Sequence, residues 1–204
     1  MHADQDHWNR VYATKAETEL SWYQSRPERS LAFIASSSRG TTDSIIDIGG
    51  GASCLVDELV ALGYADITVL DISEVALAQT RSRLGAKAET VSWIVADITR
   101  WRPARTWDIW HDRAVFHFLI GRQEQEAYLA ALRLATRAGS TVIISCFALD
   151  GPERCSGLPV QRYSAATLAA RLGAEFELTA ESSERHTTPS GGNQSFTYAM
   201  LKRR

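Results

Sequence analysis

The sequence has few of the features that mark disulfide-rich, metal-binding or membrane proteins. Its three cysteines, Cys54, Cys146 and Cys155, are widely spaced and form no CxxC pair, so no disulfide framework and no metal site are predicted. No stretch approaches the roughly 18 continuous apolar residues of a membrane-spanning helix. The N-terminus lacks the basic start and apolar run of a signal peptide. We therefore expect a cytoplasmic protein with no membrane partner.

An excess of charge of one sign is also missing. Lys and Arg total 22 against 24 Asp and Glu, which gives a formal net charge of -2, and the one basic cluster is the terminal "KRR". Nucleic-acid-binding domains usually carry a basic face, so nucleic acid is not an expected partner. With no low-complexity linker or internal repeat, we predict one domain over residues 1–204. It consists of an N-terminal helical segment (1–40) and a core (41–204).

Short apolar runs alternate with helical patterns along the chain, which predicts an α/β fold with helices on both faces of a sheet. Strand-like runs occupy residues 43–48, 66–72, 90–98, 106–112 and 140–149. Helices are expected over residues 55–62, from Ser73 to Gly85, over 122–138 and after Ser164. Two further strand-like runs flank "TTPSGGN" near the C-terminus, and they predict an antiparallel hairpin.

Three successive glycines, Gly49 to Gly51, stand between the first strand and the first core helix. In an open parallel sheet, ligands bind beyond the carboxyl ends of the strands, and a glycine-rich turn lets the backbone approach them. The second strand ends in Asp71, where a carboxylate can accept both hydroxyls of a ribose, and the third ends in Asp97, available to an adenine amino group. Asp47 would repel a pyrophosphate but attract an amino group and a sulfonium. The pattern favours S-adenosylmethionine over NAD.

The motifs "DIGGG", "VLDIS", "VADI" and "WDIWHDRAVFHFL" occur in that order and together resemble the class I S-adenosylmethionine-dependent methyltransferases over nearly the whole chain. The resemblance implies a Rossmann-like, mostly parallel seven-stranded sheet of order 3-2-1-4-5-7-6 with a C-terminal antiparallel hairpin. It also implies methyl transfer from S-adenosylmethionine. The matching positions imply cofactor contacts from Asp47, Gly49, Gly51, Asp71, Ile72, Asp97, Ile98 and His111.

The aromatic pair Trp22 and Tyr23 precedes a helix that starts near a proline. A flat apolar lid excludes water from a reaction site, and an aromatic face attracts a sulfonium. We therefore expect this pair to close over the cofactor. The alternative is that the two rings only pack between helices.

Residues for the methyl acceptor are expected after the fourth and fifth strands. His117 could orient the acceptor or take its proton, and Asp112 matches the end of the fourth strand beside the methyl group, so both are predicted as catalytic. The alternative for His117 is a hydrogen bond to the cofactor or to neighbouring backbone. Arg113 follows Asp112, and Arg162 and Tyr163 would border the acceptor in this fold; these three are predicted to contact substrate.

The aspartate–arginine pair and the tryptophan-rich N-terminus resemble the thiopurine and small-thiol methyltransferases. This implies a small-molecule acceptor with a thiol or another soft or aromatic nucleophile. A less close resemblance, to methyltransferases acting on lysines of elongation factors, implies a protein substrate as the alternative. Arg113 and Ala114 stand where that group has lysine–glycine. A third reading is a non-catalytic protein that binds S-adenosylmethionine, because the adenosine motifs do not require turnover.

Overall fold

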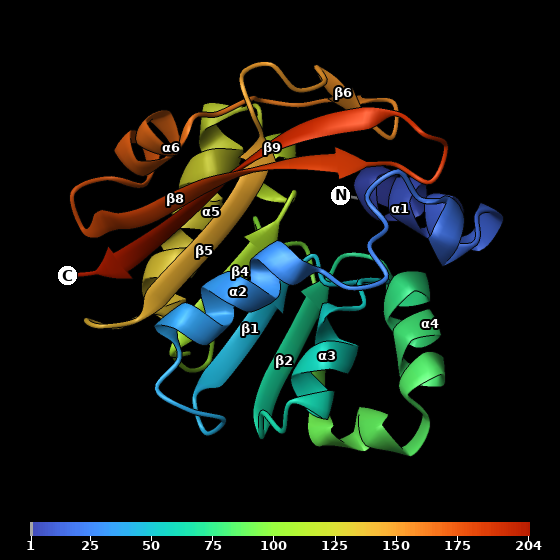
Figure 1. The fold of residues 1–204 in the computed structure, drawn as a ribbon, viewed down its shortest axis with the longest axis horizontal. Helices are drawn as coiled ribbons and strands as arrows, with labels where there is room; N and C mark the ends of the chain where they lie inside the picture. Colours follow the sequence, from blue (N-terminus) through green and yellow to red (C-terminus); the bar gives the residue numbers. More distant parts are fainter. Residues whose placement is uncertain (1) are drawn as a thin grey trace.

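The computed structural model of the protein describes residues 2–204, with side chains from residue 5 onward. Its centre is a seven-stranded sheet of order β3-β2-β1-β4-β5-β9-β8 (Figure 1). The strands are β1 (Ser44–Ile48), β2 (Asp66–Asp71), β3 (Val91–Val95), β4 (Ile109–Arg113), β5 (Thr141–Phe147), β8 (Phe176–Thr187) and β9 (Asn193–Arg203). The first five are parallel, and β9 runs antiparallel to both β5 and β8. The predicted fold class, strand order and C-terminal hairpin are confirmed.

Helices cover both faces of the sheet, as predicted. Successive side chains of a strand point to opposite faces, so Ile45 and Ile143 join one core while Ile46 and Ile144 join the other. The first core is covered by α2 (Glu28–Ser37), α3 (Leu55–Ala61) and α4 (Glu74–Leu84), the second by α5 (Arg122–Ala135) and α6 (Ala165–Leu172). The N-terminal helix α1 (His2–Thr14) and the short helix η1 (Glu17–Glu19) lie beyond the carboxyl ends of β1 and β2 (Figure 1).

Helix ends follow local hydrogen bonds. The Ser73 hydroxyl accepts from the Ala76 N–H at 3.2 Å and caps α4, as predicted. Helix α5 ends at Ala135 instead of residue 138, because Thr136 is extended and its hydroxyl donates to the Leu132 carbonyl at 2.7 Å. This bond satisfies a carbonyl of the last turn that has no further helical partner. The helix is therefore shorter than its apolar pattern suggested.

The loop after β5 contains a small hairpin that the sequence did not predict. Its strands β6 (Arg154–Cys155) and β7 (Leu158–Pro159) have two residues each, too few to produce an alternating pattern. Between them Ser156 and Gly157 both have positive φ, 49° and 80°, as in the tight turns that favour two-residue hairpin loops. The turn fixes the position of Cys155, which faces the functional cavity described below.

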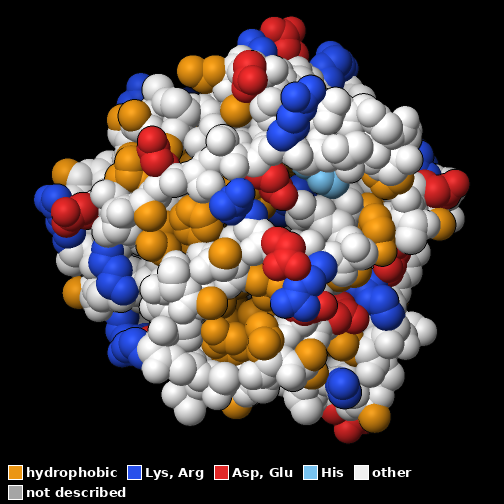
Figure 2. Space-filling view, in the orientation of Figure 1, with side chains coloured by type: hydrophobic (Ala, Val, Ile, Leu, Met, Phe, Trp, Pro, Cys, Tyr) orange, Lys and Arg blue, Asp and Glu red, His pale blue; other side chains and the backbone are white. Residues whose placement is uncertain are grey.

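Charges of both signs are mixed on the face of the molecule drawn in Figure 2, where lysine and arginine side chains are interspersed with acidic ones. No helix among residues 2–204 is long and apolar enough to cross a membrane. Within the same range, no group of three or more His, Cys, Asp and Glu side chains is arranged to hold a metal ion.

The two short helices not yet named are η2 (Gly85–Thr90) and η3 (Phe116–Phe118).

Candidate active site

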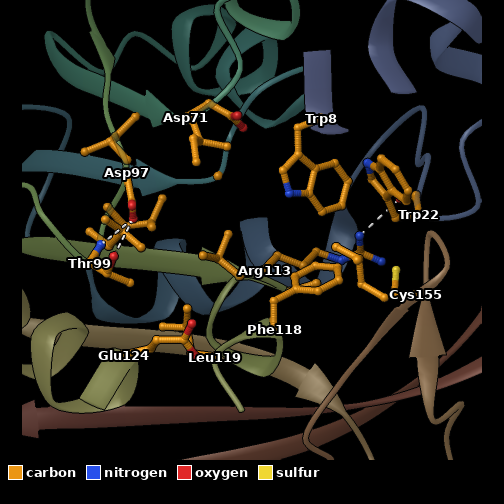
Figure 3. Close-up of a pocket in the computed structure, with 18 of the residues that line it drawn as sticks. Trp8, Trp22, Asp71, Asp97, Thr99, Arg113, Phe118, Leu119, Glu124 and Cys155 are labelled. Atoms are coloured by element: carbon orange, nitrogen blue, oxygen red, sulfur yellow. Dashed lines mark hydrogen bonds between the residues drawn. The ribbon is translucent and has the colours of Figure 1, made fainter. Parts of the chain in front are cut away.

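A cavity of about 330 Å³ lies at the carboxyl ends of the central strands (Figure 3). We call one part the aspartate end; it is lined by Asp71, Ile72, Asp97, Ile98 and Thr99. We call the other part the aromatic end; it is lined by Trp8, Trp22, Phe118, Phe147, Phe196, Arg113 and Cys155. The volume is at the lower limit of the roughly 300–1,000 Å³ usual for small-molecule sites. The structure thus brings together the predicted residues of the second and third strand ends.

A second, smaller pocket of about 40 Å³ lies under the glycine turn. Asp47, Gly49, Gly50 and His111 are among its lining residues. The two spaces are adjacent, because Tyr12, Trp22, Gly49 and Arg113 line both. Carboxylates line both spaces, and the aromatic rings of Tyr12 and Trp22 are shared between them. These carboxylates, which accept hydrogen bonds, fit a ligand that carries a ribose at one end and an ammonium group at the other.

The glycine turn lies directly against the two carboxylates. A Cβ atom on Gly50 would lie 2.5 Å from an oxygen of Asp47, and one on Gly51 would lie 2.5 Å from an oxygen of Asp71. Gly49 has φ of +69°, a conformation that side chains rarely adopt. Gly49 lines both pockets, whereas Gly51 lines neither. The glycines therefore leave room for the carboxylates as well as for a ligand.

Asp71 is buried, and burial raises its pKa to about 7, with the nearby charge of Asp47 acting in the same direction. One of its oxygens accepts the Ser73 N–H at 2.7 Å, which holds the carboxyl group in place. Asp97 differs, because the N–H and hydroxyl of Thr99 both donate to one of its oxygens, at 2.9 and 2.7 Å. Its other oxygen lies 3.6 Å from the cationic side chain of Arg100, whereas Asp71 accepts hydrogen bonds from backbone N–H groups.

Arg113 is fixed at the aromatic end by contacts from distant parts of the chain. Its Nε donates to the Tyr198 hydroxyl at 3.1 Å. Its Nη1 donates to the Trp22 carbonyl, also at 3.1 Å (Figure 3). Its guanidinium lies over the Phe196 ring, 4.6 Å from the centroid. The buried Nη2 has no hydrogen-bond partner among the described residues, and a Glu184 oxygen lies 3.9 Å away. Arg113 can therefore donate a further hydrogen bond.

Asp112 is placed beside the cavity but does not line it. One oxygen accepts the Val115 N–H at 2.8 Å, and the other accepts the Phe116 N–H at 3.1 Å and the Tyr128 hydroxyl at 2.7 Å. Burial raises the pKa of Asp112 to about 6. Asp112 was expected from the sequence to lie next to the methyl group. Its carboxylate instead faces the loop that follows β4 and the Tyr128 hydroxyl.

His117 is also outside both pockets, contrary to the expected contact with the acceptor. It is fully buried between Phe118 and Phe147, with ring centroids 4.5 and 4.7 Å away. Burial lowers its pKa to about 3, and the charge of Arg113 adds to the effect. Its Nδ1 accepts the Phe147 N–H at 3.4 Å. This matches the alternative in which His117 bonds neighbouring backbone.

The loop after β5 reaches the cavity through a different residue than expected. Arg162 donates to the Gly151 carbonyl at 3.1 Å and lines neither pocket. Tyr163 is buried in the core under α5, where its hydroxyl accepts from Gln125 at 3.2 Å. Cys155 from the same loop lines the aromatic end, and burial raises the pKa of its thiol to about 11. Arg162 and Tyr163 were expected to border the acceptor, and Cys155 lines the cavity in their place.

The N-terminal segment covers the site with four aromatic side chains. Trp22 lines both pockets and Tyr23 lines the smaller one, which is the placement expected of a lid. Trp8 and Tyr12 of α1 were not predicted as site residues, although their four-residue spacing places both on one helix face. Trp8 meets Trp22 edge to face, with ring centroids 5.9 Å apart. The rings thus form a continuous wall.

Hydrogen bonds hold this segment to both halves of the sheet. Gln5 donates to the Ile72 carbonyl at 3.0 Å, beyond the end of β2. Arg83 of α4 donates to Glu17 at 2.6 Å. On the other side, His186 of β8 donates to the Ser21 carbonyl at 2.8 Å. The segment therefore bridges the aspartate end and the C-terminal hairpin.

Comparisons with known proteins find similarity to methyltransferases. A family model described as a methyltransferase domain matches residues 45–139. An eEF1A lysine and N-terminal methyltransferase from Mus musculus is 25% identical over 135 residues, which are 66% of this chain and 19% of that protein. The chain thus spans about a fifth of the length of this curated relative.

Solved structures are similar over almost the full chain. The N-methyltransferase NodS from Bradyrhizobium japonicum, solved with S-adenosyl-L-homocysteine, superposes with a TM-score of 0.73 at 14% identity, covering 98% of this chain and 97% of NodS. A SAM-dependent methyltransferase from Anabaena variabilis gives a TM-score of 0.76 at 14% identity, covering 100% and 94%. At these identities the likeness concerns the fold.

Proposed function

We propose that this chain is a class I S-adenosylmethionine-dependent methyltransferase, because a methyltransferase-domain model matches residues 45–139 and the strand order is the one expected of that class. We further propose that it methylates a small-molecule acceptor through a thiol or another soft or aromatic nucleophile. The observation that carries the proposal is the charge of the aromatic end. Among the described residues, Arg113 is the charged side chain at the aromatic end, with Glu184 3.9 Å from its guanidinium, while Glu124 lines another part of the cavity. A lysine ammonium entering there would meet a like charge, whereas a thiolate or another anion would meet an opposite one.

The residues of the site fit the cofactor. Asp71 would accept the ribose hydroxyls, Asp97 would face the adenine edge between Ile72 and Ile98, and Asp47 would receive the ammonium group. When bound, S-adenosylmethionine supplies an electrophilic methyl group on a positively charged sulfur. Trp22 and its aromatic neighbours would exclude water from that group.

Among the described residues of the aromatic end, no side chain is placed as a base for a poorly acidic acceptor. His117 has a pKa of about 3 and lines neither pocket. Both oxygens of Asp112 already accept hydrogen bonds, from two N–H groups of the loop after β4 and from the Tyr128 hydroxyl. Cys155 is a neutral thiol at pH 7, because its pKa is near 11. An acceptor that ionises without help therefore suits the site best, and a thiol of pKa about 8.5 does so far more readily than an amine of pKa about 10.4.

Cofactor affinity is expected to rise with pH. Asp71 has a pKa of about 7, so at pH 6 most of it is protonated and its carboxyl cannot accept both ribose hydroxyls. As the pH rises through about 7 the carboxylate forms, and S-adenosylhomocysteine should bind more tightly. Calorimetric titrations between about pH 5.5 and 8.5 would measure this. Asp71→Asn should bind more weakly with a flatter profile; a flat profile in the natural protein would contradict the assignment.

Replacing Arg113 by methionine should raise the KM for a thiol acceptor by about tenfold, because the anionic form loses its charged partner. Arg113→Lys keeps the charge and should recover part of this loss. The dissociation constant of S-adenosylhomocysteine, measured by calorimetry, should change much less in both variants. Equal acceptor KM values for the methionine variant and the natural protein would remove Arg113 from the acceptor site.

The proposal is tested with methyl-labelled S-adenosylmethionine, the purified protein and a lysate, supplemented in parallel with simple thiols and phenols. Label in small molecules supports the proposal. Label in one protein band would favour the alternative of a protein lysine acceptor, which the similarity to the eEF1A lysine methyltransferases supports. Tight S-adenosylhomocysteine binding with no transfer to any acceptor would favour a non-catalytic binding protein.

A further inference from the structure

We propose that His111 and Ser30 are positioning residues that orient the Asp47 carboxylate toward the amino group of the bound cofactor. On this proposal, the three side chains make the site select for a ligand that carries an amino-acid end. The inference rests on the proposed function, because it assumes that the adenosine part of the ligand binds at the aspartate end.

The three side chains form one buried chain of hydrogen bonds. Asp47 and His111 are directly paired in register between β1 and β4, which places their side chains side by side on one face of the sheet. His111 Nδ1 lies 2.7 Å from Asp47 Oδ1, and His111 Nε2 lies 2.9 Å from the Ser30 hydroxyl on α2. Their exposed fractions are 3% for Asp47, 2% for His111 and 0% for Ser30.

His111 bridges the two side chains. Its Nδ1–H donates to Asp47, because a carboxylate oxygen can only accept, and its Nε2 shares a hydrogen bond with the Ser30 hydroxyl. The contact with Ser30 thus holds the ring in the orientation in which His111 presents a donor to the carboxylate. Asp47 Oδ2 lies against the turn, 2.5 Å from the place of a Gly50 Cβ atom. The carboxylate is therefore held at one oxygen and keeps the other beside the smaller pocket.

The charges around the smaller pocket fit the amino-acid end of the cofactor, which carries both signs. Two carboxylates, Asp47 and Glu17, and the guanidinium of Arg113 line it. Glu17 forms an ion pair with Arg83 at 2.6 Å. Among the described residues, Asp47 has no lysine or arginine within ion-pair distance. Its one ionisable partner is His111 at 2.7 Å, so an ammonium group arriving beside Asp47 would add a charged partner to a buried carboxylate and would be favoured.

The test compares two ligands in the same variants. S-adenosylhomocysteine carries the amino-acid end, whereas 5′-methylthioadenosine has the same adenosine and a thioether but no amino group. Calorimetry should find that His111→Phe weakens S-adenosylhomocysteine binding about tenfold and changes 5′-methylthioadenosine binding less than about twofold. Ser30→Ala should lower the same affinity by a smaller factor, again without affecting 5′-methylthioadenosine.

Two further variants separate positioning from general damage. His111→Gln retains an N–H that can reach Asp47 and should recover much of the lost affinity for S-adenosylhomocysteine. Asp97→Ala should weaken both ligands by the same factor. Equal losses for both ligands in Ser30→Ala and His111→Phe, or no loss for either, would overturn the proposal. A natural protein that bound neither ligand would instead refute the proposed function itself.

Discussion

Replacing Asp71 by alanine is expected to weaken S-adenosylhomocysteine binding by about 10- to 150-fold. The two-pronged, charge-assisted hydrogen bond from the carboxylate to the ribose would contribute about 1.5–3 kcal/mol in total. Asp71 stands at the carboxyl end of β2, 5% exposed, and lines the aspartate end. Isothermal titration calorimetry at pH 8, above its pKa of about 7, measures the effect with Asp71 ionised.

Asp66 is the matched control, because it lies at the opposite end of the same strand. Its carboxylate pairs with Arg105 at 2.6 Å, far from either pocket. Asp66→Ala should leave the dissociation constant unchanged. If Asp71→Ala also left it unchanged, the ribose would bind elsewhere and the cofactor assignment would have to be abandoned.

Replacing Asp112 by alanine should lower the free energy of unfolding by about 3 kcal/mol or more. Three buried donors would lose their acceptor, namely the N–H groups of Val115 and Phe116 and the hydroxyl of Tyr128. Each unsatisfied buried donor costs roughly 1–3 kcal/mol, and the total stability of a domain is only about 5–15 kcal/mol. Urea denaturation followed by tryptophan fluorescence measures the change.

The Asp112 variants also separate a structural role from a chemical one. Asp112→Asn keeps an oxygen for the backbone N–H groups, so its stability and its kcat should stay near those of the natural protein. The exposed Asp150 is the surface control, and its replacement by alanine should shift stability by less than about 0.5 kcal/mol. A large loss of kcat in a stable Asp112→Asn variant would restore the catalytic role that the sequence suggested.

The parts of the fold that depend on repeated patterns were predictable. The apolar strand runs, the cap at Ser73 and the glycine turn are local signals that tertiary contacts reinforce. The end of α5 was missed because it depends on the extended backbone of Thr136, and the apolar pattern continues past it. The β6–β7 hairpin was missed because two-residue strands have no period.

The candidate site also has a part that could be predicted from the sequence and a part that could not. Parallel register places Asp47, Asp71 and Asp97 at one edge of the sheet, so their meeting followed from the sequence. The loops are different, because distant partners decide which side chain faces the cavity. His117 is turned into the core, where the Phe147 N–H donates to it, and Arg162 is held by the Gly151 carbonyl. Neither partner can be identified from spacing along the chain.

The aromatic end is assembled from opposite ends of the chain. Trp8 and Trp22 belong to the N-terminal segment, while Phe196 lies in β9, which closes the sheet against β5. The aspartate end uses only strands and turns between residues 44 and 99. Chains grow from the N-terminus during synthesis, so the nucleotide half can take shape while the wall of the aromatic end is still incomplete. A nascent chain stalled before β9 would have the residues that hold adenosine but would lack Phe196, over which the Arg113 guanidinium lies.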